Sequence, residues 1–168
     1  MSQSAAIGRH IASCIDGLYR GLGESAPRLT NDAYVVRAHE ASRAFGAVAL
    51  EIREHLGGLE QSPFIIVEAM LFNCAETDPT GALAMYATSM LLVPRILVSL
   101  LDARTSCDDQ DLLAILDRAS QVLVSEIHAI GDAAKTQPGI VDESWQLAAR
   151  DLSEMLENAG FSDSFGIS

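Results

Sequence analysis

The stretch YVVRAHEASRAFGAVALEIREHL, residues 34–56, decides the fold class, because its apolar side chains recur at steps of three and four. This spacing puts them on one side of a helix and the charged residues on the other. The members of this apolar seam are Tyr34, Ala38, Ala41, Phe45, Val48, Ile52 and Leu56. Asn31 or Asp32 can cap the start, and Gly57-Gly58 ends the pattern. We therefore expect a helix over residues 32–57.

Similar patterns predict five further helices. They cover residues 4–22, 63–76, 79–103, 107–135 and 141–158. Gly21 and Gly23 are expected to end the first of them. The dipeptides Ser62-Pro63 and Asp78-Pro79 each combine a capping residue with a proline suited to the first helical turn. Ser106 to Asp109 resembles a capping box for the helix at 107–135.

The two middle helices, 63–76 and 79–103, are apolar nearly all round, which predicts that both are central and buried. Pro94 lacks a backbone N–H and crowds the preceding turn, so we expect a kink there. Together these features predict an all-α fold, a single domain of residues 1–168. In it, two central apolar helices are wrapped by amphipathic ones, and residues 161–168 form a loose tail.

Composition narrows the classes of partner. The chain has 168 residues and a net charge of -12, so nucleic-acid backbones and anionic membranes would be repelled, whereas a protein partner with a basic face would be attracted. The uncharged run 79–94 is too short to cross a bilayer. Cys14, Cys74 and Cys107 have neither the spacing of a zinc site nor that of a disulfide framework, and no secretory signal is visible. We expect a cytoplasmic protein without a metal or another cofactor.

His39 is the most suggestive residue for chemistry. It lies off the apolar seam, and Arg43 follows one turn later, where a guanidinium could meet an anion held by the imidazole. The stretch resembles the phospho-acceptor helix of histidine phosphotransfer domains and of sensor histidine kinases, through His39-Glu40 and the apolar residues that follow. It departs from that pattern at Arg43, which comes one position late, and at Ala44, where those families commonly have proline or glycine. The resemblance implies phosphoryl transfer through His39, without autokinase activity, since no glycine-rich ATP-binding region follows.

Glu68 stands inside the apolar run of the helix at 63–76. A buried carboxylate requires a partner, and Arg95, beside Pro94, is the candidate. Such a pair would mark a pocket for a small apolar ligand between the helices at 63–76 and 79–103. The alternative is that Glu68 lies at the solvent edge of its helix.

No nucleophile elbow, phosphate-binding loop or dinucleotide-binding glycine pattern appears, so we expect a protein that is not an enzyme. Glu51 and His55 are one turn apart, a spacing that favours a structural side-chain pair over a metal site. A stripe of small residues beside the seam, with Ser42 and Gly46 at its centre, allows a second helix to approach closely. That helix belongs either to the same chain or to a second subunit. The sequence thus favours an interaction or regulatory protein, a homo-oligomer that binds a protein partner through an exposed helix face.

Overall fold

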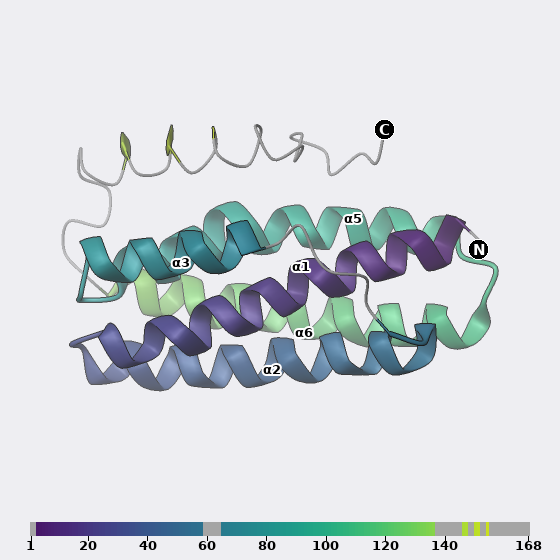
Figure 1. Cartoon of the computed structure of the whole chain (residues 1–168), viewed down its shortest axis with the longest axis horizontal. Coiled ribbons are helices and arrows are strands. Elements are labelled where there is room, and N and C mark those ends of the chain that lie inside the picture. The colour runs from purple at the N-terminus through teal and green to yellow at the C-terminus, as the bar shows by residue number, and fades with distance from the viewer. Residues whose placement is uncertain (1–2, 59–64, 137–145, 148–149, 152–153, 155–168) are drawn as a thin grey trace.

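The computed structural model describes residues 3–58, 65–136, 146–147, 150–151 and 154. Its helices are α1 (Gln3–Ser25), α2 (Asp32–Leu56), α3 (Ile65–Thr77), α4 (Ala82–Ala87), α5 (Val93–Thr105) and α6 (Gln110–Lys135), with a 3-10 turn η1 (Ala26–Arg28) and a π-helical turn η2 (Thr88–Leu92) (Figure 1). Because α4, η2 and α5 run on as one helix, this part of the chain forms five long helices and no strand. The all-α prediction is confirmed. The predicted sixth helix, 141–158, and the tail at 161–168 fall largely or wholly outside the described residues.

Helix α2 follows the sequence pattern closely. The Asn31 side chain accepts hydrogen bonds from the backbone N–H groups of Ala33 and Tyr34, which identifies it as the N-cap. Gly57 ends the helix with a φ of 77°, a left-handed conformation that glycine adopts without strain. Every seam residue is buried except Leu56, which is half-buried.

Helix α1 is longer than predicted, because Gly21 and Gly23 do not end it. A Cβ atom on Gly21 would lie 2.8 Å from Leu71 Cδ1 and 3.1 Å from the Cα of Glu68, so α3 crosses α1 at this point. A Cβ on Gly23 would lie 3.1 Å from Ser42 Oγ on α2. Both glycines provide room for neighbouring helices, and α1 continues to Ser25.

The start of α4 was predicted three residues too early. Asp78 does act as a cap, since its carboxylate accepts from the backbone N–H and the hydroxyl of Thr80 and from Leu83 N–H at 2.8 Å. However, Gly81 takes a φ of 91°, which makes residues 79–81 a turn and starts the helix at Ala82. Pro79 belongs to this turn, where its carbonyl accepts hydrogen bonds from Thr30.

The irregularity expected at Pro94 takes the form of the π turn η2. Val93 N–H donates to the carbonyl of Thr88, five residues back. In a regular helix Pro94 would have no N–H for the Met90 carbonyl and its ring would press on that turn, so a wider turn just before the proline relieves the crowding. Ser89, inside the π turn, donates to the carbonyl of Ile127 on α6.

Helix α6 begins at Gln110, later than the capping box suggested. Asp109 is the N-cap, and its carboxylate accepts from the N–H groups of Asp111 and Leu112 at 3.0 Å each. Ser106 instead donates back to the carbonyl of Ala103 at the end of α5. It therefore closes the preceding helix and does not open the next one.

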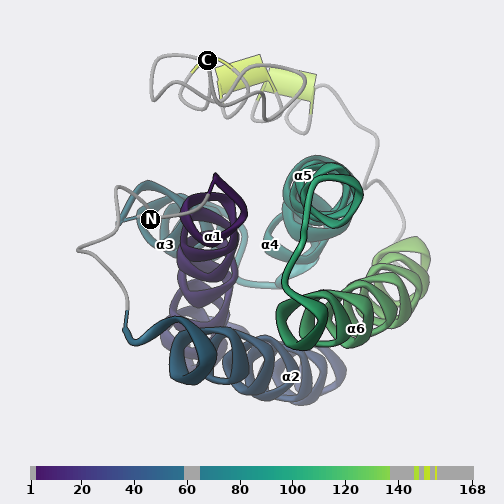
Figure 2. The ribbon, with the colours of Figure 1, turned by 90° about the vertical axis from the view of Figure 1, so that its right-hand side faces the viewer.

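Figure 2 shows how the helices are arranged when viewed along their length. Their buried apolar side chains form one core. Helix α1 packs against α2 and α3, α2 packs against α6, and α6 returns along α5. The helices at 63–76 and 79–103 were predicted to be central, but α3 and α5 each leave one side exposed to solvent. Helix α3 exposes Ala69, Asn73 and Glu76, and α5 exposes Val98 and Leu101. An apolar helix at the edge of a bundle buries only the side that its neighbours cover.

Polar side-chain contacts join α2 to α6 and to its N-cap at three levels. Arg37 contacts Glu126 at 2.6 Å, Glu51 contacts Arg118, and His55 Nε2 lies 3.0 Å from Asp109 Oδ2. The predicted pairing of Glu51 with His55 is therefore wrong, because each residue finds its partner on the neighbouring helix.

Within the described part of the chain, one helical stretch, Ala82–Thr105, is long and apolar enough to cross a membrane by length and composition. More than half of its most apolar window is buried inside the bundle. Core helices of bundles have this composition as well.

Candidate interaction surface

Large apolar side chains are exposed along one side of the continuous helix that α4, η2 and α5 form. Met90 is 54% exposed, Val98 46% and Leu101 41%. Half-buried side chains continue the surface between and before them. We define the α5 face as Tyr86, Met90, Pro94, Leu97, Val98 and Leu101. Their steps of three and four keep them on one side of the helix.

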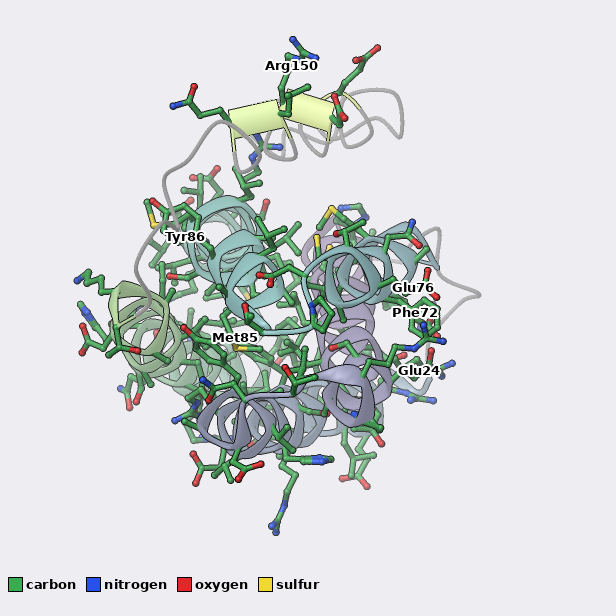
Figure 3. The ribbon with its side chains drawn as sticks, turned by 90° about the vertical axis from the view of Figure 1, so that its left-hand side faces the viewer. Glu24, Phe72, Glu76, Met85, Tyr86 and Arg150 are labelled. Atoms are coloured by element: carbon green, nitrogen blue, oxygen red, sulfur yellow. The ribbon has the colours of Figure 1, made fainter. Side chains whose placement is uncertain are left out.

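The opposite side of the same helix enters the core. Figure 3 shows this at two consecutive residues: Met85 points into the bundle, whereas Tyr86 lies on its outer edge. Met85 and Leu100 are fully buried and Ile96 nearly so. Arg95 is the one charged residue between Ala82 and Leu101. Because the sequence supplies so few charged side chains here, the outer side of the helix also carries apolar ones. An exposed apolar face of this kind marks interaction sites more often than isolated apolar residues do.

Exposed apolar residues on the other helices have charged neighbours. On α2, Val36 and Leu50 are 56% and 53% exposed, but Glu40 and Arg43 lie between them on the same outer side. Val124, 40% exposed, stands alone on α6. The six members of the α5 face, by contrast, have no charged residue among them, although Asp102 is exposed directly after Leu101.

His39 and Arg43 are both exposed on the outer side of α2, as the sequence predicted. Near them, Arg37 is held by Glu40 at 3.1 Å and by Glu126, so it is engaged in the contact between α2 and α6. An imidazole in this position is open to solvent. A phosphotransfer role for His39 and Arg43 stays a prediction.

The small-residue stripe on α2 is covered by α1 of the same chain. Ser42 donates to the carbonyl of Tyr19 at 2.7 Å, and a Cβ on Gly46 would lie 2.8 Å from the Tyr19 ring. Ala49, further along the stripe, is 1% exposed. Of the two occupants considered, the intramolecular helix is therefore the one present.

Glu68 lies at the crossing of α3 with α1 and is half-buried. Burial raises the pKa of its carboxyl, and so do a hydrogen bond with Glu24 and the negative charges of Glu24 and Asp16, while Arg20 acts in the opposite direction. These neighbours all lie on α1. Arg95, half-buried on α5, is not among the groups that shift the pKa of Glu68. Their role in ligand binding stays a prediction.

The sequence analysis did not identify the α5 face, because the helix at residues 79–103 was predicted to be mostly buried. A signal was present: the run has more apolar residues than one buried side of a helix can use, so some of them had to face outward. Among the described residues, no group of three or more His, Cys, Asp or Glu side chains is arranged to hold a metal ion.

Three comparisons, with protein-family models, with curated proteins and with solved structures, found no match to this chain. The described surfaces are therefore the basis for the proposals that follow.

Proposed function

We propose that this protein is a non-enzymatic helical interaction protein that binds a protein partner through the α5 face. The observation that carries the proposal is the exposure of Met90, Val98 and Leu101 on a helix whose opposite side is core. Side chains of this size gain free energy when they leave water, about 25 cal/mol for each Å² buried. A rigid helix face that is already ordered offers this area with little loss of conformational freedom.

The partner best suited to this surface presents an amphipathic helix. Apolar side chains spaced by three and four residues are matched by a second helix that carries the same spacing. The net charge of -12 favours a partner with basic residues around its apolar stripe, and steers its approach more than it adds affinity. The same charge disfavours direct contact with nucleic acid or an anionic membrane, and we propose a cytoplasmic location.

Substitution of Val98 by aspartate tests the proposal. Placing a photo-crosslinking amino acid at Leu101 should trap the partner in cells, and Val98→Asp should abolish the adduct. Leu50→Asp on α2 is the matched control, because Leu50 is exposed to a similar extent on a different helix. An adduct of unchanged yield in Val98→Asp, or one formed only between copies of this chain, would overturn the proposed partner.

A second candidate is phosphoryl transfer through His39, favoured by the exposure of that residue on a regular stretch of α2. Incubation with phosphorylated response regulators should then label the protein, and His39→Gln should remove the label without changing the melting temperature. Absence of label across several regulators would eliminate this candidate.

A further inference from the structure

The outer side of α2 carries a second surface, separate from the α5 face. We propose that two copies of this chain pair through this surface, with their α2 helices antiparallel. We define the α2 face as six exposed residues, which are Ala33, Val36, Glu40, Arg43, Ala47 and Leu50. Helices α2 and α5 lie on opposite sides of the bundle (Figures 1 and 2), so the pairing does not use the α5 face.

The six residues follow the spacing of a coiled-coil seam. Successive members are alternately three and four residues apart, as the two inward positions of a heptad repeat are. The buried seam of α2, from Tyr34 to Ile52, already packs against α1 and α6. The α2 face is therefore a second seam, and it is spaced to receive another helix on the outer side.

The order of residues along the α2 face is complementary to itself in reverse. In one antiparallel register Glu40 lies opposite Arg43 of the second copy, and two-fold symmetry forms the same pair twice. The same register brings apolar members together, Val36 with Ala47 and Ala33 with Leu50. A parallel arrangement would place Glu40 beside Glu40 and Arg43 beside Arg43. The charges therefore select the antiparallel arrangement and its register.

Both partners of this charge pair are accessible. Among the described residues, Arg43 takes part in no ion pair. The Glu40 side chain is 60% exposed, and its contact with Arg37 uses Oε2, which leaves Oε1 for Arg43 of the second copy. Two chains of net charge -12 repel each other at long range, so opposite charges at the centre of the contact offset part of this repulsion.

A dimer joined through α2 carries its two α5 faces on the outside. Self-association then leaves both α5 faces free. Where the proposed function holds, one dimer can bind two partner helices, and a target that carries two such helices gains affinity.

Charge reversal tests the pair of Glu40 with Arg43. Sedimentation equilibrium of the full chain should report twice the mass of the 17.9 kDa chain. Arg43→Glu should yield a monomer with unchanged helical circular dichroism, because glutamates then face each other twice. Addition of Glu40→Arg to that variant should restore the dimer, because opposite charges meet again.

Cysteine substitutions test the orientation. In the antiparallel register the two copies of Val36 are eleven residues apart, about 16 Å along the axis, which is too far for a disulfide. Val36→Cys and Ala47→Cys should therefore crosslink when the two variants are mixed and oxidised, and neither should crosslink alone. The unsubstituted chain measures the background from Cys107, which is half-buried.

Two further variants separate this inference from the function of the α5 face. Leu50→Asp should abolish the dimer and leave the partner adduct at Leu101 unchanged, whereas Val98→Asp should abolish the adduct and leave the dimer. A monomeric intact chain, a dimer that survives Arg43→Glu, no recovery in the double variant, or disulfides in either cysteine variant alone would overturn the inference. None of these outcomes depends on the partner, so each proposal can fail without the other.

Discussion

Replacement of Gly21 by alanine tests the close approach of α1 and α3. A glycine inside a helix costs about 1 kcal/mol relative to alanine, so helix propensity alone predicts that Gly21→Ala stabilises the protein. The structure predicts the opposite, because the new Cβ would lie 2.8 Å from Leu71 Cδ1 and 3.1 Å from the Glu68 Cα. Leu71 is fully buried and the Cα belongs to the backbone of α3, so the helices must separate.

Forced insertion of a methyl group into a packed contact costs about 1–3 kcal/mol. Subtraction of the propensity gain leaves a net loss of up to about 2 kcal/mol, or a fall in Tm of up to about 4–8 °C for a domain of this size. Gly46→Ala is the matched control, since its Cβ would also lie 2.8 Å from another side chain. That side chain is Tyr19, which is 42% exposed and free to turn outward.

Gly46→Ala should therefore leave stability unchanged or raise it by up to about 1 kcal/mol. Thermal and urea unfolding followed by circular dichroism measure both variants. An equal rise in Tm for Gly21→Ala and Gly46→Ala would refute the assignment of Gly21 to a helix crossing.

Three other substitutions test separate features. Ser99→Ala should raise stability by about 1 kcal/mol in urea unfolding, because the Ser99 hydroxyl is buried without a hydrogen-bond partner among the described residues; a loss would mean that a partner exists. Glu68→Gln should raise Tm at pH 7, since the raised pKa of Glu68 means that folding disfavours its ionised form. That gain should shrink as the pH falls through the raised pKa of Glu68 and be gone by about pH 4, where the carboxyl is protonated in both the folded and the unfolded state; a gain independent of pH would contradict it. Asp109→Ala should lower Tm at neutral pH, because the hydrogen bond from Leu112 N–H and the one with His55 lower the pKa of Asp109 and so make its ionised form stabilising. The deficit should shrink as acid titrates Asp109 below about pH 4, and a deficit unchanged in acid would count against this cause.

The sequence predicted helices well where caps and spacing agree. Around α2, the Asn31 cap, the seam and Gly57 all indicate the same boundaries, and the structure has them within one residue. Spacing reports on the side chains of one helix. Spacing is less informative where contact with another helix determines the role of a residue. Gly21 is an example, because the sequence suggests the end of a helix there, whereas in the structure this glycine lies against Leu71 of α3.

Burial was harder to predict than helix position. The apolar run at 79–103 is compatible with a helix at the centre of the bundle and with one at its edge. The spacing of apolar residues does not reveal how many other helices pack against a helix. The exposure of Val98 could not be deduced for this reason. Glu68 illustrates the same limit, because the groups that shift its pKa, Glu24, Arg20 and Asp16, come from α1, which spacing along α3 does not reveal.

The three polar pairs along α2 and α6 affect how the two helices align. The pairs run in opposite order along the two helices, so Arg37 meets Glu126 and His55 meets Asp109. A slip of one helical turn would bring Arg37 level with Val122 or Ile130 and would break all three pairs at once. Weak surface pairs of this kind add little stability individually. Taken together, they favour the observed register of the two helices over one that is shifted by a turn.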